Sequence, residues 1–252
     1  MRTLLLDIET APNIAHVWGL WQQNVAINQL VDSGYVLCWA AKWLGDSGIM
    51  FDSIHKSKPK TMLKRVHDLL SECDVVVHYN GKSFDIPTLN KEFILHKMTP
   101  PAPYKQIDLC QVAKSTFRFP SNKLAYIAKV LGVSEKKTTR GHELWVGCMN
   151  NDPECWQEME EYNRADVVSL EGVYERMRPW VRSHPNHGLY DEPGLPVCPS
   201  CGSGRIQRRG YARTTVNKFA RYCCMDCGSW SREAITELPK EDRQMILRSD
   251  LG

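Results

Sequence analysis

Apolar positions in the first 180 residues follow two different periods. Met62, Val66 and Leu70 repeat at the spacing of an amphipathic helix, whereas the three valines at 75–77 are typical of a buried strand. The pattern predicts strands over Arg2–Ile8, Tyr35–Leu44, Gly48–Ile54 and Asp74–Tyr79, and another strand that ends near Asp108. It predicts helices over Lys60–Cys73, Ile86–His96, Leu109–Phe117, Lys123–Leu131 and from Asp152 to about Pro179. Strands followed by alternating strands and helices indicate an α/β domain with a mixed sheet.

This periodicity stops after residue 182. Residues 183–197 contain three prolines and two glycines and show no repeat, so we expect a linker there. Half of the ten cysteines then fall between Cys198 and Cys227. We therefore predict an α/β domain over 1–182, a linker over 183–197, a small cysteine-rich unit over 198–236 and a charged tail over 237–252.

Composition excludes several protein classes. Of the 252 residues 42% are hydrophobic and 24% are charged, which is typical of a globular protein and excludes intrinsic disorder and fibrous repeats. No run of about 20 apolar residues is present, so we expect no membrane partner. The three leucines at 4–6 are too few for a secretory signal. These features favour a cytoplasmic protein.

Positive charge is concentrated near the C-terminus. The net charge of the chain is +3, but residues 195–252 hold ten basic and six acidic residues, while the remainder is close to neutral. A basic segment attached to a neutral domain indicates a polyanionic partner.

Three short acidic motifs carry the candidate chemistry. Asp7 and Glu9 are two positions apart at the end of a strand, so both carboxylates point to one face. Asp85 opens a predicted helix, and Tyr162 and Asp166 are one turn apart on another. Each motif alone has a simple structural explanation: a solvated strand end, a helix cap and a solvated helix face, respectively.

Together these motifs resemble the DEDD family of 3′–5′ exonucleases, in the subclass with tyrosine in the third motif. The resemblance covers roughly residues 1–181. It extends to the proofreading-type exonuclease domains of family B polymerases and to stand-alone phage and bacterial exonucleases. It implies a ribonuclease H-like fold, in which a mixed sheet is flanked by helices.

The resemblance also assigns roles. It implies that Asp7, Glu9, Asp85 and Asp166 hold two Mg²⁺ or Mn²⁺ ions, the catalytic cofactors of phosphodiester hydrolysis. Tyr162, with an ordinary pKa near 10, is expected to position the attacking water rather than to deprotonate it.

Substrate contacts are predicted less directly. Thr10 and Asn80 lie beside the acids in sequence and are candidates for the terminal nucleotide, although turn chemistry explains either. Trp18 and Trp21 are candidates for stacking on unpaired bases, against the alternative that they belong to the core. Lys123 is a candidate phosphate contact or a solvated lysine. For Asp108 we favour a capping role, or a role in supporting the metal ligands, over metal ligation.

The C-terminal cysteines form two Cys-x2-Cys pairs separated by 22 residues, Cys198/Cys201 and Cys224/Cys227. This spacing predicts a zinc ribbon with one structural Zn²⁺, and it leaves Cys223 as a bystander. Between the pairs, Arg208, Arg209 and Arg213 are interspersed with aromatic residues, which suits nucleic-acid contact. A purely structural ribbon or a protein partner, such as a replication or repair protein, is the alternative.

The leading hypothesis is an enzyme, a 3′–5′ exonuclease that acts on single-stranded nucleic-acid 3′ ends, with DNA favoured. One alternative is a non-catalytic nucleic-acid-binding or adaptor protein with a vestigial acidic site. A structure-specific endonuclease is the other.

Overall fold

The computed structural model describes residues 1–133, 139–190, 194–248 and 250. The chain forms two compact units, Arg2–Tyr174 and Glu175–Gly252, and Met1 groups with the second. Their boundary lies within the long C-terminal helix of the first unit, earlier than the predicted linker, of which residues 191–193 lie outside the described residues. In the described part of the chain no helix is both long and apolar enough to cross a bilayer.

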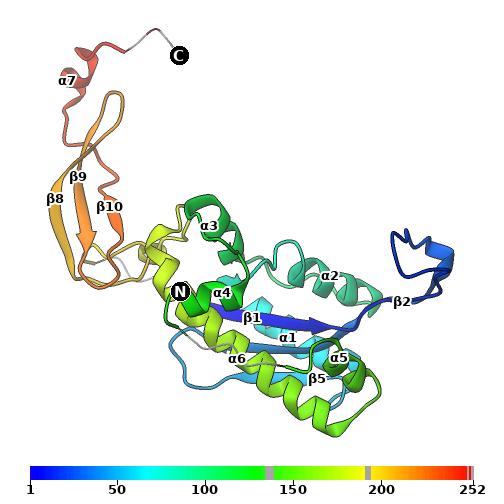
Figure 1. Ribbon diagram of the computed structural model, residues 1–252. Coiled ribbons are helices and arrows are strands. Elements are labelled where there is room, and N and C mark those ends of the chain that lie inside the picture. The colour runs from blue at the N-terminus through cyan, green and yellow to red at the C-terminus, as the bar shows by residue number, and fades with distance from the viewer. Residues whose placement is uncertain (134–138, 191–193, 249, 251–252) are drawn as a thin grey trace. The chain divides into compact units, whose positions relative to one another are not determined.

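A five-stranded mixed sheet forms the centre of the first unit (Figure 1). Its strands are β1 (Thr3–Thr10), β4 (Val36–Trp43), β5 (Met50–Ser53), β6 (Val75–His78) and β7 (Lys105–Asp108). They lie in the order β5-β4-β1-β6-β7. β1 pairs antiparallel with β4 and parallel with β6, so the sheet is mixed, as predicted.

One face of the sheet packs against α1 (Pro59–Glu72) and α2 (Asp85–Leu95). Leu4, Leu6 and Ile8 of β1 point to this face. The apolar side of α1, which includes Val66 and Leu70, covers them and is itself fully buried. Because side chains alternate along a strand, Asp7 and Glu9 must point to the opposite face.

That opposite face is covered by α5 (His142–Met149) and α6 (Pro153–Met177). Asp152 caps α6, since its carboxylate accepts hydrogen bonds from the backbone N–H groups of Glu154 and Cys155. Trp156 and Met159 of α6 pack against Leu37 and Cys38 of β4. The acidic pair of β1 therefore faces the helix that carries Tyr162 and Asp166.

Two further helices follow β7, namely α3 (Leu109–Thr116) and α4 (Leu124–Val130). Between β1 and β4 the chain leaves the sheet and forms β2 (Ile14–Ala15), a 3-10 turn at Ile27–Gln29 and β3 (Leu30–Asp32). We call this segment, residues 11–35, the excursion. Figure 1 shows it as the dark blue loop that projects past the end of β1.

The second unit is built around a three-stranded antiparallel sheet of β8 (Ile206–Arg213), β9 (Lys218–Cys224) and β10 (Trp230–Arg232), with β9 in the centre. Short 3-10 turns at Arg178–Trp180 and His187–Leu189 precede it, and α7 (Lys240–Gln244) follows it. The predicted cysteine-rich unit thus contains a small β-sheet. The tail positions 249, 251 and 252 lie outside the described residues.

Candidate functional site

The acidic motifs of β1 and α6 meet on one face of the sheet. Ligand oxygens of Asp7, Glu9 and Asp166 all lie within 4.8 Å of one another. Asp7 and Glu9 are two residues apart on β1, opposite Ala40 and Cys38 of β4, and Asp166 reaches them from α6. Segments more than 150 residues apart in sequence therefore build one carboxylate cluster.

Asp85 lies beside this cluster. It is the first residue of α2, it is buried, and its Oδ1 accepts a hydrogen bond from the backbone N–H of Ile8 at 3.3 Å. The cap position of α2 belongs to Phe84, so the alternative interpretation of Asp85 as a simple helix cap is wrong. The hydrogen bond to the backbone of β1 holds this carboxylate against the strand that carries Asp7 and Glu9.

The loop before Asp85 is held by Asp108. The Asp108 carboxylate accepts hydrogen bonds from the backbone N–H groups of Asn80 and Lys82 and also caps α3. The favoured capping role of Asp108 is confirmed. Asn80 has a positive φ of 66°, and a Cβ on Gly81 would lie 2.4 Å from the His78 ring. Turn geometry therefore accounts for Asn80 and requires glycine at the next position.

Burial and mutual repulsion shift the pKa values of the cluster. Burial, followed by the neighbouring carboxylates, raises the pKa of Asp7 well above its usual range. Burial and Asp166 raise the pKa of Glu9 to about 8, and burial raises that of Asp85 to about 7. A divalent cation among these oxygens would replace the protons and cancel the repulsion, so the residues present fit such an ion.

Two uncharged side chains orient the acids. Asn163 is fully buried on α6, and its Nδ2 donates to Asp7 Oδ2 at 2.6 Å. Trp145 on α5 donates from Nε1 to Glu9 Oε2 at 3.1 Å. Each leaves its carboxylate with other lone pairs available to a cation. These contacts fix the direction in which the cluster presents its oxygens.

Tyr162 lies against this cluster. Its ring meets the ring of Trp145 edge-on, with 6.0 Å between centroids. Burial, then the charges of Asp166 and Glu9, raise the pKa of the Tyr162 hydroxyl above its ordinary value. The hydroxyl therefore stays protonated at neutral pH, which fits a hydrogen-bonding group and not a general base.

A cavity of about 440 Å³ opens between the end of β1 and the start of α2. One wall is formed by Thr10–Asn13 and Gly34, at the base of the excursion, and the other by Phe84, Pro87, Thr88 and Lys91 at the start of α2. The lining includes Thr10 and Phe84, the sequence neighbours of Glu9 and Asp85, but neither of these carboxylates is among the lining residues.

The remaining candidates are exposed. Trp18 and Trp21 on the excursion are 98% and 85% exposed, so the alternative that they are core residues is wrong. Lys123 is exposed immediately before α4.

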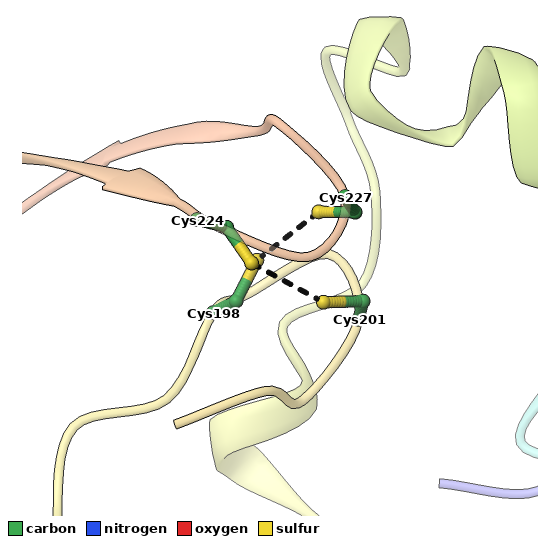
Figure 2. Close-up of side chains that lie close together, drawn as sticks. All are labelled: Cys198, Cys201, Cys224 and Cys227. Atoms are coloured by element: carbon green, nitrogen blue, oxygen red, sulfur yellow. Dashed lines mark hydrogen bonds between the residues drawn. The ribbon is translucent and has the colours of Figure 1, made fainter. Parts of the chain in front are cut away.

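The four cysteines form a second cluster (Figure 2). The Sγ atoms of Cys198 and Cys227 are 3.7 Å apart, and those of Cys201 and Cys224 are 3.6 Å apart. A tetrahedral ion with Zn–S bonds of about 2.3 Å requires S···S distances of about 3.8 Å. The sulfur arrangement therefore fits a zinc ion, and Cys223 is not part of the cluster.

The two Cys-x2-Cys turns, at Cys198/Cys201 and Cys224/Cys227, have the same local structure. Gly202 and Gly228 have positive φ values of 75° and 78°, and their N–H groups donate to the carbonyls of Cys198 and Cys224. Burial opposes ionisation of Cys224, but the backbone N–H groups of Cys227 and Asp226 outweigh it and lower the pKa of this thiol to about 7. A thiolate ready to bind a metal is thus available near neutral pH.

The three candidate arginines of the C-terminal unit have different partners. Arg208 forms an ion pair with Glu237, Arg213 stacks on Tyr211, and Arg209 hydrogen-bonds Gln207.

Comparison with known proteins decides the family. A family model described as the RNase H superfamily matches residues 40–178, which is more than half of the chain. The chain belongs to the RNase H superfamily. The matched stretch includes Asp85, Tyr162 and Asp166 and begins after the strand of Asp7 and Glu9. No curated protein matches the chain significantly.

This RNase H-superfamily chain is also similar to a much larger solved structure, the family B DNA polymerase from the hyperthermophilic archaeon Pyrobaculum calidifontis. The TM-score is 0.55 at 19% sequence identity, and the match covers 71% of this chain but only 24% of the polymerase chain. At this identity the similarity supports the fold alone.

Sequence reasoning missed two residues of the RNase H-like site, Asn163 and Trp145. Asn163 is three positions before Asp166, a spacing that places both on one side of α6, and this was a usable signal. Trp145 had none, because the sequence pattern predicts no helix over His142–Met149.

Proposed function

We propose that the protein is a metal-dependent 3′–5′ exonuclease that hydrolyses phosphodiester bonds at single-stranded 3′ ends, with DNA favoured over RNA. The observation that carries the proposal is the half-buried cluster of Asp7, Glu9 and Asp166 oxygens within 4.8 Å of one another, with Asp85 beside it. Membership of the RNase H superfamily supports a nuclease. The tyrosine-subclass resemblance supports the direction of cleavage.

In this proposal the four carboxylates hold two Mg²⁺ or Mn²⁺ ions. Such ions make an attacking water more acidic and neutralise charge on the phosphate and on the leaving oxygen. Asn163 and Trp145 keep Asp7 and Glu9 in place through their hydrogen bonds. Tyr162, protonated at neutral pH, orients the attacking water by a hydrogen bond.

The terminal nucleotide would occupy the cavity between the base of the excursion and α2. Its volume of about 440 Å³ and the side chains of Thr10, Asn13 and Phe84 in its lining suit a sugar and a base, and Lys91 adds a positive charge to the same lining. Trp18 and Trp21 are exposed on the same excursion, which contains no lysine or arginine. We assign them to stacking on unpaired bases further along the strand. Asn80 and Lys123 remain candidate contacts on the loop before α2 and ahead of α4.

The zinc ribbon would bind substrate and deliver it to the site. Its excess of positive charge supports this role, and its four thiolates hold one structural Zn²⁺ in the proposal. A replication or repair protein as partner of the ribbon is the competing outcome.

The test is digestion of matched 5′-labelled single-stranded DNA and RNA in the presence of Mg²⁺, Mn²⁺ or a chelator. We expect a ladder that shortens from the 3′ end, faster on DNA, and no products with the chelator. Discrete internal products would identify an endonuclease. Binding without cleavage under every metal condition would favour the non-catalytic alternative.

A further inference from the structure

The ribbon sheet has two chemically different faces, which the strand register defines. Arg208 pairs with Tyr222, Tyr211 with Ala220 and Arg213 with Lys218, so these side chains share one face. We call it the Tyr211 face. Arg232 pairs with Arg221, and Trp230 pairs with Cys223, two positions from Arg221. We call this opposite side the Arg221 face, and its members are Gln207, Arg209, Phe219, Arg221, Trp230 and Arg232.

A bulge in β8 keeps the two sets apart. The register shifts between Arg208 and Tyr211, and Gly210 within the shift has a positive φ of 71°. The extra residue places Tyr211 on the same face as Arg208 and leaves Arg209 on the other side. The Arg209 carbonyl accepts a hydrogen bond from Arg221 Nε at 3.1 Å, which ties it to the Arg221 face.

The Tyr211 face has acidic partners for its polar groups. Arg208 forms an ion pair with Glu237, and the Tyr222 hydroxyl donates to Glu233 at 2.6 Å. Lys218 Nζ lies 3.8 Å from the centroid of the Tyr211 ring. Glutamates that reach this face reduce its attraction for another polyanion.

The Arg221 face carries three arginines, Arg209, Arg221 and Arg232, all exposed. β8, β9 and β10 contain no acidic residue, and within the described residues none of these guanidinium groups lies within ion-pair distance of a carboxylate. The guanidinium carbon of Arg221 lies 4.8 Å from the ring centroid of Trp230, and that of Arg232 lies 3.8 Å from the ring centroid of Phe219. The ring contacts orient the guanidinium groups without neutralising them.

We propose that the Arg221 face is the nucleic-acid surface of the ribbon, where Arg209, Arg221 and Arg232 contact successive phosphates of a single strand and Trp230 stacks on a base. This inference deepens the proposed function by specifying where the ribbon binds. It replaces the mixed set Arg208, Arg209 and Arg213, because two of those three side chains lie on the Tyr211 face.

Single-stranded nucleic acid fits this face better than a protein does. Uncompensated guanidinium groups beside a ring that is 53% exposed provide both the charge and the stacking surface that an unpaired strand requires. Phosphate contacts release counterions, so the binding should depend steeply on salt, whereas stacking contributes a part that does not.

The experiment compares two matched charge removals in the full-length, zinc-loaded protein, on an Asp7→Asn background that prevents cleavage. One variant carries Arg209→Gln, Arg221→Gln and Arg232→Gln, and the control carries Arg208→Gln, Arg213→Gln and Lys218→Gln. Fluorescence anisotropy with a labelled single-stranded DNA measures affinity over a range of salt concentrations. Zinc content per chain verifies that the ribbon is intact in each variant.

We expect the Arg221-face variant to lose about tenfold or more in affinity and its slope of log K against log salt to shrink by about 2, since each phosphate contact to a single strand contributes about 0.7. The control should keep nearly the whole slope. Replacing the same three arginines by lysine should restore the slope. Trp230→Ala should weaken binding about fivefold or more without changing the slope.

Equal losses in the two variants would mean that net charge alone matters, and the assignment of a face would be wrong. Unchanged affinity in both variants would mean that the ribbon does not bind nucleic acid. Cleavage by the protein with an intact Asp7 is measured separately. A protein that cleaves but is insensitive to both variants refutes this inference alone, whereas one that binds through the Arg221 face but never cleaves refutes only the proposed nuclease.

Discussion

The acidic cluster and the cysteine cluster are two candidate metal sites with opposite relations to the fold. The carboxylates are placed by a sheet and a helix that bury extensive apolar surface, so their positions do not require an ion. The four cysteines lie within 30 residues, in a unit whose strands bury little besides Phe219, Ala220 and two cysteines. A unit this small would depend on an ion held by these cysteines for its stability.

The energetic consequences differ accordingly. In the acidic site the fold brings like charges together, so each carboxylate reduces the stability of the metal-free protein. In the proposed function the same carboxylates hold the catalytic ions. In the proposed zinc site each thiolate would contribute to stability through the ion. Removing a carboxylate ligand should therefore lower activity and raise the stability of the metal-free protein. Removing a cysteine ligand should lower stability and change activity little.

Asp7→Asn should have the largest effect. Loss of one ligand is expected to reduce the rate of hydrolysis by about 1,000-fold, as several kcal/mol of transition-state stabilisation disappear. The same change removes a carboxylate that Glu9, Asp85 and Asp166 repel, so the thermal midpoint of the variant without Mg²⁺ or Mn²⁺ should rise. Nuclease assays and thermal denaturation measure the two effects. Near-normal rates would exclude Asp7 as a ligand, and a lower midpoint would contradict the repulsion argument.

The acidic residues could be predicted from sequence because their positions follow from simple periodicity. The two-residue spacing of Asp7 and Glu9 and the four-residue spacing of Tyr162 and Asp166 each fix a common face. The strands and helices around them were predicted for the same reason, and α1 and β6 match within two residues.

Other features depend on packing that no local pattern reveals. The loop 80–84 is shaped by Asp108, nearly 30 residues away, and Trp145 reaches Glu9 from a helix without a distinct periodic signal. The two faces of the ribbon depend on a bulge at Gly210, and one extra residue reverses the face of every side chain beyond it. Simple alternation would place Arg209 and Arg213 on one face, whereas the bulge separates them.

A substitution of Asn163 tests how much activity depends on the orientation of the Asp7 carboxylate. Asn163→Ala removes the 2.6 Å hydrogen bond to Asp7, and we expect the rate to fall by about 10- to 100-fold, as for other residues that orient metal ligands. A higher Mn²⁺ concentration should recover part of the loss, because the defect lies in ligand orientation. Glu161→Ala, an exposed position on the same helix, is the control. An equal loss in both variants would indicate a general effect on α6.

The ribbon should respond in the opposite manner to loss of ligands. A variant with Cys198→Ser and Cys227→Ser should bind no zinc and lose the β8–β10 sheet, which we expect to weaken DNA binding by about tenfold in a salt-dependent way. Hydrolysis of a saturating short substrate should change little. Metal analysis and limited proteolysis follow the ribbon, with Cys223→Ser as the control. A full loss of hydrolysis at saturation would show that the acidic site depends on the ribbon.

The pH dependence of stability gives the smallest effect but separates the two sites most clearly. Folding raises the pKa of Glu9 from 4.5 to about 8 and that of Asp85 from 3.8 to about 7. Between its unfolded and its folded pKa, each of these carboxyl groups holds a proton in the folded protein that it has released in the unfolded chain. Stability without Mg²⁺ or Mn²⁺ should therefore fall as pH rises through this window.

Thermal midpoints of the zinc-loaded protein, measured across that pH window, should therefore decrease by several degrees, and saturating Mg²⁺ should restore stability most at the alkaline end. Buried His78, whose pKa burial lowers, opposes this trend at the acidic end, so the comparison is made against Glu9→Gln. The variant should show a shallower decrease and a smaller response to Mg²⁺. Identical pH profiles for the two proteins would mean that Glu9 stays ionised in the fold, and the carboxylates would then not be repelling one another.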